Sequence, residues 1–321
     1  MECDRSSEIL HDFAPRIRVY KDGYIERLLK DDTVSPSFDL ETRVRSKDVS
    51  ITPSVSARIY LPTSSPEKAK LPLLIYFHGG AFCLYSAASS IYHHYINSLT
   101  AAANAIVVSV DYRLAPETPM PACYDDSWTA AQWAASAADP WISRRADLRR
   151  GVYLAGDSAG ANIAHDVLSR VGPGGSIGPG VRVAGLAMVH PFFGDDKPNE
   201  LWNYLYPGTC GVYDPRLNPA ADPARMRRAV MGCKRVLVCV GGKDFLRERG
   251  VRYYVVLKEG ESEGWEGQVE YFESIGRGHV FHLYKPNCDE ALELLKRVAS
   301  FINKSSYGWD VYVDLMIKAS S

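Results

Sequence analysis

Apolar and polar positions along the chain form two alternating kinds of segment. Nearly continuous apolar runs, typical of strands buried on both faces, cover residues 71–77, 105–110, 152–155, 183–189, 236–240 and 269–272. Helical spacing of apolar residues covers residues 88–103, 123–137, 159–171, 246–259 and 289–303. Strands that alternate with helices predict an α/β fold, with helices on both faces of a mostly parallel central sheet. In such a fold, ligands bind at the carboxyl ends of the strands.

The first 50 residues are mostly polar and too irregular to form a core of their own. Residues 17–20 and 24–28 flank Lys21-Asp22-Gly23, and the Asp-Gly pair predicts a hairpin. Strand signals begin near Val44, and residues 54–61 alternate apolar with polar, which predicts a strand with one buried face. We expect residues 1–45 to form a segment that covers a site.

Residues 194–232 interrupt the alternation of strands and helices. The stretch is rich in glycine, proline and aromatic residues. It forms either a surface excursion with aromatic side chains packed onto the core or a cap that lines a substrate pocket. The cap is favoured because loops of this length in compact domains are usually functional. We therefore predict a single domain over residues 1–321 with a cap insertion at about 195–225, and we assign no role to the tail, residues 304–321.

Composition narrows the class of protein. The 321 residues are 46% hydrophobic and 23% charged with a formal net charge of −1, and no strongly basic stretch occurs, which argues against a nucleic-acid partner. The seven cysteines form no C-x-x-C pair, so neither a zinc site nor a disulfide framework is indicated. We expect no membrane span, because no apolar run reaches about 18 residues. The polar N-terminus favours a cytoplasmic location. The oligomeric state stays open.

The turn after residues 152–155 carries the strongest chemical signal. It reads Gly156-Asp157-Ser158-Ala159-Gly160 and leads into an amphipathic stretch. This strand–turn–helix context fits the G-x-S-x-G nucleophile elbow, in which a side chain at either glycine would collide with a neighbouring element. The turn raises the Ser158 hydroxyl out of the sheet and places the Ala159 N–H at a helix N-terminus. A plain glycine-rich turn is the alternative.

A second glycine pair follows residues 71–77. His78-Gly79-Gly80 leaves backbone N–H groups uncovered by side chains, and an oxyanion needs such donors held in place beforehand. An H-G-G-G-type segment has this role in the hydrolase fold. We expect the N–H groups of Gly79, Gly80 and Ala159 to form the oxyanion hole, with His78 in the same segment. The alternative is an ordinary strand-to-loop turn.

A serine nucleophile needs a base, and the base needs an orienting acid. In this fold the chain order is serine, acid, histidine, and only His279 and His282 lie beyond the last predicted strand. His279 is favoured because it follows the flexible Gly276-Arg277-Gly278, whereas His282 fits a packed position. Asp244 follows the strand at 236–240 on a glycine turn, so it is the expected acid, with a helix N-cap as its alternative.

Two further features fit structural roles. His165 lies on the predicted elbow helix and faces away from the turn. Asp111-Tyr112-Arg113-Leu114-Ala115-Pro116-Glu117 follows the strand at 105–110. We interpret this motif as a structural turn in which Asp111 pairs with Arg113 and holds the loops.

Together these motifs resemble the plant carboxylesterases of the hormone-sensitive-lipase-like group of α/β-hydrolases. The similarity runs from about Phe13 to Asn303, and it is carried by Pro15–Gly23, His78–Gly80, Asp111–Glu117, Gly156–His165 and Gly278–His282. The resemblance implies an α/β-hydrolase fold and esterase activity on small or medium acyl esters, without a cofactor or metal. Ser158 then is the nucleophile, Asp244 the orienting acid and His279 the base. Ala81 replaces the usual third glycine, which would narrow the acyl pocket.

The same resemblance leaves two other functions open. Gibberellin-type receptors of this group have lost the triad histidine and bind a small molecule without hydrolysing it. Dehydratases and cyclases of the group, such as 2-hydroxyisoflavanone dehydratase, carry out elimination or rearrangement on plant metabolites. Because the chain keeps Ser158, Asp244 and His279, we expect a serine carboxylesterase that acts on a small-molecule ester.

Overall fold

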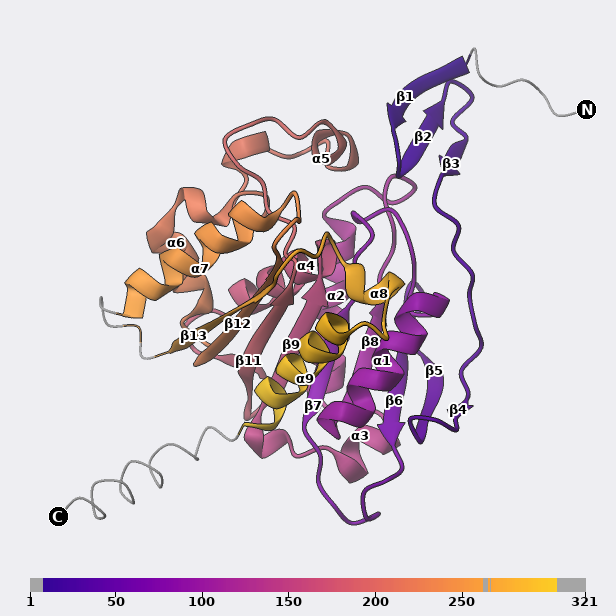
Figure 1. Cartoon of the computed structure of the whole chain (residues 1–321), viewed down its shortest axis with the longest axis vertical. Coiled ribbons are helices and arrows are strands. Elements are labelled where there is room, and N and C mark those ends of the chain that lie inside the picture. The colour runs from indigo at the N-terminus through magenta and orange to yellow at the C-terminus, as the bar shows by residue number, and fades with distance from the viewer. Residues whose placement is uncertain (1–7, 262–264, 266, 305–321) are drawn as a thin grey trace, which may run out of the picture.

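The computed structural model describes residues 8–261, 265 and 267–304. The first seven residues and residues 305–321, which include nearly all of the tail without an assigned role, lie outside the described part. Within it, a long twisted sheet is covered by helices on both faces (Figure 1). The predicted α/β architecture is confirmed. In the described residues, no helix is both long and apolar enough to cross a membrane.

The large sheet has the strand order β13-β12-β11-β9-β7-β8-β6-β5-β4, and β10 pairs with β11. Strands β13 to β8 in this order run parallel, and β6, β5 and β4 continue the sheet antiparallel. The strands span Phe38–Asp39 (β4), Val44–Thr52 (β5), Val55–Pro62 (β6), Leu73–Phe77 (β7), Ile106–Asp111 (β8), Val152–Asp157 (β9), Ser176–Gly178 (β10), Val181–Val189 (β11), Arg235–Gly241 (β12) and Gln268–Ser274 (β13).

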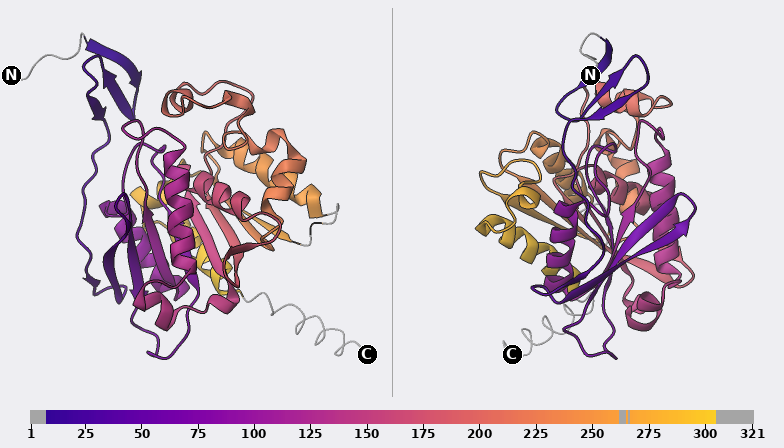
Figure 2. Two further views of the ribbon diagram at one scale, coloured as in Figure 1. Left: turned by 180° about the vertical axis from the view of Figure 1, so that it is seen from behind. Right: turned by 90° about the vertical axis from the view of Figure 1, so that its right-hand side faces the viewer.

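The helices form two layers, one on each face of the sheet (Figure 2). Side chains of α1 and α9 share one apolar core, and those of α2, α4 and α7 share the other. The α-helices span Ser90–Ala103 (α1), Ala122–Ala135 (α2), Pro140–Arg145 (α3), Ala159–Val171 (α4), Glu200–Leu205 (α5), Pro223–Val230 (α6), Arg247–Glu261 (α7), Phe281–Tyr284 (α8) and Asp289–Asn303 (α9). Short 3-10 turns lie at Leu148–Arg150, Gly211–Tyr213 and Pro219–Ala221.

The expectation for residues 54–61 is only partly right. β6 forms there, but Arg58 and Tyr60 are buried as well as the apolar face. The second face is covered because α1 packs on it and the chain before β4 runs across its end. A strand covered in this way does not show the simple alternation of a half-exposed strand.

The N-terminal segment forms a separate small sheet of β1 (Ile9–Phe13), β2 (Ile17–Tyr20) and β3 (Ile25–Arg27). β2 and β3 pair antiparallel across the Asp22-Gly23 turn, so the predicted hairpin is confirmed. The small sheet and α5 lie at the same end of the large sheet (Figure 1). Tyr204 of α5 packs against the rings of His11 and Phe13 of β1.

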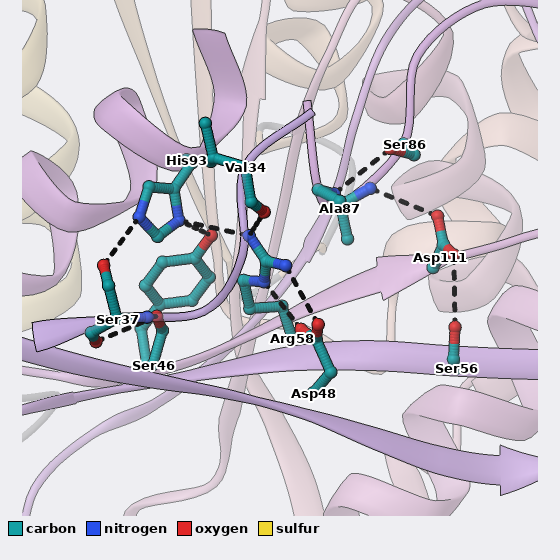
Figure 3. Close-up of polar contacts among 12 residues, drawn as sticks. Val34, Ser37, Ser46, Asp48, Ser56, Arg58, Ser86, Ala87, His93 and Asp111 are labelled. Atoms are coloured by element: carbon teal, nitrogen blue, oxygen red, sulfur yellow. Dashed lines mark hydrogen bonds and ion pairs between the residues drawn. The ribbon is translucent and has the colours of Figure 1, made fainter. Parts of the chain in front are cut away.

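A strap of residues 28–37 connects the small sheet to β4 along the edge of the molecule, and polar contacts hold it there (Figure 3). The buried Arg58 guanidinium donates to the Val34 carbonyl at 2.8 Å and forms a fork on the Asp48 carboxylate at 2.6 and 2.9 Å. His93 Nε2 lies 3.4 Å from the Ser37 hydroxyl. These bonds fix the path of the strap, and with it the place of the small sheet.

Candidate active site

Ser158 occupies a sharp, strained turn between β9 and α4. Its φ of 51° and ψ of −119° lie in a region that residues with a side chain rarely adopt. A Cβ at Gly160 would lie 1.9 Å from the Phe77 carbonyl oxygen, and one at Gly156 would lie 2.4 Å from the Gly160 carbonyl carbon. Only glycine fits at either position. The turn is therefore specified by close backbone packing, as the motif predicted.

A continuous chain of hydrogen bonds runs from Ser158 through His279 to Asp244. His279 Nε2 lies 2.9 Å from Ser158 Oγ, and His279 Nδ1 lies 2.8 Å from Asp244 Oδ2. Because an ionised carboxylate can only accept, Nδ1 carries the ring proton and Nε2 is free to accept from the serine. The three residues follow β9, β13 and β12, whose carboxyl ends meet at one edge of the sheet.

Asp244 and His279 are held by further bonds. Asp244 Oδ1 accepts from the Leu246 N–H at 2.8 Å, and the Asp244 side chain is almost fully buried. The next residue after the histidine, Val280, has a φ of 44°, which is exceptional for a β-branched residue. Its N–H donates to His190 Nδ1 at 2.7 Å. The loop that carries His279 is thus fixed by a second histidine.

His190 is a site residue that the motif-based analysis missed. It directly follows β11, on the strand beside the elbow, and only 1% of it is exposed. The pKa of His190 lies well below its usual value, mainly because the ring is buried and secondly because His282 is nearby. The ring therefore stays neutral, and Nδ1 can accept a hydrogen bond. The sequence feature that could have identified His190 is its position at the carboxyl end of a central strand.

The expected oxyanion donors need one correction. The Gly79 N–H donates to the Tyr92 hydroxyl at 2.8 Å and is not free to bind an oxyanion. Gly80 and Ala81 follow with φ of 104° and 52°. In the described part of the chain, the N–H groups of Gly80, Ala81 and Ala159 donate to no other group. At this loop the Gly79 N–H, expected from the sequence to be free, is engaged, whereas the Ala81 N–H is free within the described residues.

The His78 side chain supports this loop from behind. His78 Nδ1 lies 2.8 Å from the Gly79 carbonyl oxygen, and the ring stacks on Tyr112 with 4.2 Å between centroids. The Tyr112 hydroxyl donates to the His78 carbonyl oxygen at 2.7 Å. The ring is buried, and burial lowers its pKa. His78 therefore supports the shape of the loop, and its buried ring packs behind the loop.

Asp157 links the elbow to the same loop. Its carboxylate accepts from the Tyr76 hydroxyl at 2.7 Å and from the Tyr92 hydroxyl at 2.9 Å. Burial raises the pKa of Asp157 to about 6, and the two tyrosine hydrogen bonds oppose that shift. Tyr92 therefore donates to Asp157 and accepts from Gly79, so that one hydroxyl joins the residue before the nucleophile to the oxyanion loop.

Ser158 opens into a cavity of about 230 Å³. This volume is just below the range of about 300–1,000 Å³ that is usual for drug-sized ligands, which favours a small ligand. Among the described residues, its wall is formed by Pro15, Arg16, Leu29, Gly80, Ala81, Leu84, Tyr85, Tyr92, Asp157, Ser158, Phe192, Phe245, Leu246, His279, Val280, Leu283 and Tyr284. The N-terminal segment is part of this wall.

Residues 195–225 differ from the sequence-based expectation of a pocket-lining cap. None of the described residues in the cavity wall comes from this stretch. Trp202 of α5 instead packs edge-on against Phe82 and parallel to Phe192, with centroids 5.7 and 6.3 Å away. Because Phe192 lines the cavity, the insertion supports the wall from outside.

Three other predictions on polar residues have clear outcomes. Arg113 does not pair with Asp111: its guanidinium forms a fork on Asp126 of α2 at 2.7 and 2.8 Å, and its N–H donates to the same carboxylate. That prediction was wrong because α2 turns back beside the motif. His165 is buried and bonded to Tyr253, away from the elbow. His282 is also buried and does not reach Ser158, as expected for a packed residue.

One group of side chains in the described residues has the geometry to hold a metal ion, namely His190, Asp244 and His279, whose ligand atoms lie within 4.8 Å of one another. Each of the three is already committed to a hydrogen bond. His190 Nδ1 accepts from Val280, and Asp244 Oδ2 faces His279 Nδ1. These atoms therefore belong to the hydrogen-bonded arrangement around His279 that is described above.

Residues 74–283 match the family described as the alpha/beta hydrolase fold. The chain belongs to this family. The match includes the elbow, Asp244, His279 and the whole of His78-Gly79-Gly80. It explains why the carboxyl ends of β9, β12 and β13 bring these side chains together, since ligands in open α/β sheets bind at that edge.

Relatives of this α/β-hydrolase include both esterases and dehydratases. It is 42% identical to the 2-hydroxyisoflavanone dehydratase of Glycyrrhiza echinata, over 92% of this chain and 97% of that protein. It is 40% identical to Probable carboxylesterase 2 of Arabidopsis thaliana, over 90% and 95% of the two chains. The solved structure of a Pyrobaculum calidifontis esterase superposes with a TM-score of 0.65 at 26% identity, covering 81% and 84%. The predicted resemblance to plant carboxylesterases is confirmed.

Proposed function

We propose that the protein is a serine carboxylesterase that hydrolyses small to medium acyl esters through an acyl-enzyme. The main observation in support is the hydrogen-bonded series Ser158–His279–Asp244, of which Ser158 and His279 line the cavity. The carboxylesterases among its plant relatives support the same activity. The roles of the individual residues rest on geometry and chemistry.

In the acylation step, Ser158 Oγ attacks the ester carbonyl carbon while His279 Nε2 takes the hydroxyl proton. The carbonyl oxygen becomes an oxyanion and receives hydrogen bonds from the N–H groups of Gly80, Ala81 and Ala159. Asp244 stabilises the imidazolium without taking its proton. The C–O bond to the alcohol then breaks, and His279 gives the proton to the leaving oxygen.

In the deacylation step, water repeats the sequence. His279 Nε2 removes a proton from water as the water oxygen attacks the acyl carbon of the ester on Ser158. The same three N–H groups hold the second oxyanion. When this intermediate collapses, the carboxylic acid leaves and Ser158 recovers its proton from His279.

We also propose that two segments form the walls around this chemistry. Residues 1–45 contribute Pro15, Arg16 and Leu29 directly to the cavity, and residues 195–225 support Phe192 from behind. These segments determine which esters fit, whereas the triad and the N–H donors are independent of them. The cytoplasmic location remains a prediction from the sequence alone.

A dehydratase is the second candidate, because 2-hydroxyisoflavanone dehydratases from two plants share 42% and 40% of their residues with this chain. In that reaction His279 would remove a proton from carbon, and the N–H donors would stabilise the resulting enolate while a hydroxyl leaves as water. Ser158 would then need no covalent bond to the substrate.

Product analysis separates the two candidates. The protein is incubated with a series of acyl esters of increasing chain length and with a 2-hydroxyisoflavanone, and products are identified by mass spectrometry. Release of an acid and an alcohol in equal amounts supports the esterase. Covalent labelling of the peptide that contains Ser158 by a fluorophosphonate probe supports it as well. Loss of water from the hydroxylated substrate, with no ester turned over, would replace it with the dehydratase.

A further inference from the structure

Arg16 lies in the wall of the active-site cavity and has no side-chain partner among the described residues. It is partly buried, and its side chain forms no hydrogen bond or ion pair with any described residue. Two other arginines of the described N-terminal segment behave differently. Arg18 pairs with Asp12 at 3.1 Å, and Arg27 forms a fork on Glu117 at 2.7 and 2.8 Å. Buried charges in proteins are normally paired, and Arg16 is partly withdrawn from solvent without a described partner, which makes it a candidate to bind a ligand.

The position of Arg16 is fixed by its backbone. Its N–H donates to the Phe13 carbonyl at 3.0 Å, and its carbonyl accepts from the Leu28 N–H at 2.9 Å. The next residue, Ile17, is fully buried in the main core. Arg27 on the neighbouring strand ties the same small sheet to the oxyanion loop through the Cys83 carbonyl at 2.9 Å. Arg16 is therefore held at the cavity and does not belong to a loose surface segment.

Arg16 lines the same cavity as Gly80 and Ala81 of the oxyanion loop. Burial raises the pKa of the Cys83 thiol to about 12, and the positive charges of Arg27 and Arg16 oppose that shift. Cys83 lies two residues after Ala81, which is one of the proposed oxyanion donors. Because Arg16 and Ser158 line the same cavity, the guanidinium is within the electrostatic reach of a ligand bound beside Ser158.

Among the described residues, the rest of the cavity wall offers the Arg16 guanidinium no hydrogen-bond or ion-pair partner. Apart from the proposed catalytic residues, the side chains are aliphatic or aromatic, and the hydroxyls of Tyr85 and Tyr284 bond to each other at 2.9 Å. The acidic side chain in the wall, Asp157, has its carboxylate oxygens engaged by Tyr76 and Tyr92. An anionic group on the ligand would give Arg16 the direct partner that the described wall does not supply.

We propose that the physiological ester carries a carboxylate, separated from the scissile carbonyl by an apolar body, and that Arg16 binds this carboxylate through its guanidinium fork. A guanidinium matches the planar geometry of a carboxylate in a bidentate pair. A single positive charge balances a monoanion, whereas a phosphate dianion would leave one charge uncompensated. This inference rests on the proposed esterase function and defines the substrate class of that same site.

The test compares esters of equal size that differ in charge. The acyl side is tested with the 4-nitrophenyl monoester of glutaric acid against 4-nitrophenyl pentanoate. The alcohol side is tested with 4-acetoxybenzoate against 4-methylphenyl acetate. We expect the wild-type protein to show a higher kcat/KM for the anionic member of at least one pair, and the preference to shrink as ionic strength rises. The pair that responds identifies the side of the ester on which the carboxylate lies.

Three variants assign the preference to Arg16. In Arg16→Gln, the kcat/KM of the preferred anionic ester falls about tenfold or more, and that of its neutral partner changes less than about twofold. Arg16→Lys keeps the charge without the fork and gives an intermediate loss. Lys21→Gln removes the same charge from the exposed β2–β3 turn and leaves the preference unchanged. Equal rates for charged and neutral esters, or an equal loss for both in Arg16→Gln, would overturn the proposal.

A binding measurement separates this proposal from the proposed function. Glutarate and 4-methoxybenzoate are titrated by calorimetry into Ser158→Ala and into the double variant Ser158→Ala/Arg16→Gln. Binding that disappears only in the double variant supports the carboxylate site even if no ester is hydrolysed. Hydrolysis without a charge preference, together with equal binding to both variants, leaves the esterase standing and removes the role of Arg16.

Discussion

Val280 donates its backbone N–H to His190 Nδ1 across 2.7 Å, so the residue after the proposed base is held by the histidine that directly follows β11. The bond supports a left-handed backbone at a β-branched residue, with a φ of 44°. Because the bond stabilises this strained backbone beside His279, we expect its loss to disturb the alignment of His279 with Ser158. His190 is a positioning residue in this account.

We predict that His190→Ala lowers kcat by about 10- to 100-fold with little change in KM, because misplacing a catalytic group by about 1 Å costs on this order. His190→Asn restores an acceptor and recovers part of the loss. The measurement is the pH dependence of kcat and KM with a short-chain 4-nitrophenyl ester. An equal fall for both variants, matched by an equal loss of thermal stability, would indicate a purely structural role.

Tyr92 provides a second test, at the oxyanion loop. Tyr92→Phe removes the donor to Asp157 and the acceptor for the Gly79 N–H, and we expect kcat to fall about 10-fold or more because the loop loses its anchor. Tyr95→Phe is the matched control on the same helix, since the Tyr95 hydroxyl has no partner in the described residues. Its kcat should stay within twofold of wild type. Equal effects of the two changes would remove Tyr92 from the account.

The backbone contact at the elbow predicts a large stability effect. Gly160→Ala places a Cβ 1.9 Å from the Phe77 carbonyl oxygen, so we expect the free energy of unfolding to fall by more than about 4 kcal/mol, or no folded protein. Gly174→Ala, where a Cβ meets nothing within 4 Å, should change it by less than about 0.5 kcal/mol. Urea unfolding measures both. A folded Gly160→Ala protein of normal stability would contradict the tight elbow.

Buried histidines make stability depend on pH. Burial lowers the pKa of His282 to about 3, and both of its ring nitrogens lack partners in the described residues. The folded-state pKa lies below the unfolded value of about 6.5, so this stability is complete above pH 6.5 and is lost as pH falls toward 3. Each such histidine contributes a slope of up to about 1.4 kcal/mol per pH unit. His282→Leu should reduce the slope of unfolding free energy between pH 6.5 and 5 by up to this amount, and an unchanged slope would exclude the effect.

Much of the fold and the core of the site could be predicted from the sequence because burial is periodic. Runs such as 71–77 and 236–240 correspond to β7 and β12. Chain order, together with a glycine-rich loop or turn after a strand, led to the choice of Asp244 and His279. These inferences depend on local patterns and on the fixed topology of a parallel sheet.

What the sequence could not predict depends on pairs that only the folded chain brings together. Gly79 meets Tyr92 from the next helix, 13 residues away, and Val280 meets His190 across 90 residues. Arg113 pairs with Asp126, although Asp111 is nearer in sequence. A polar residue in a motif has several potential hydrogen-bond partners in the sequence. Which of them it contacts depends on how the neighbouring helices and strands pack.

The most direct test of the central claim is the kcat/KM of Ser158→Ala for 4-nitrophenyl butyrate, measured beside wild type and Ser169→Ala, which changes an exposed serine on the same helix. We predict that Ser158→Ala loses about 10⁴-fold or more, because nucleophile, base and acid act as a unit, while Ser169→Ala keeps wild-type activity. Hydrolysis by Ser158→Ala within tenfold of wild type would contradict the assignment of Ser158 as the nucleophile.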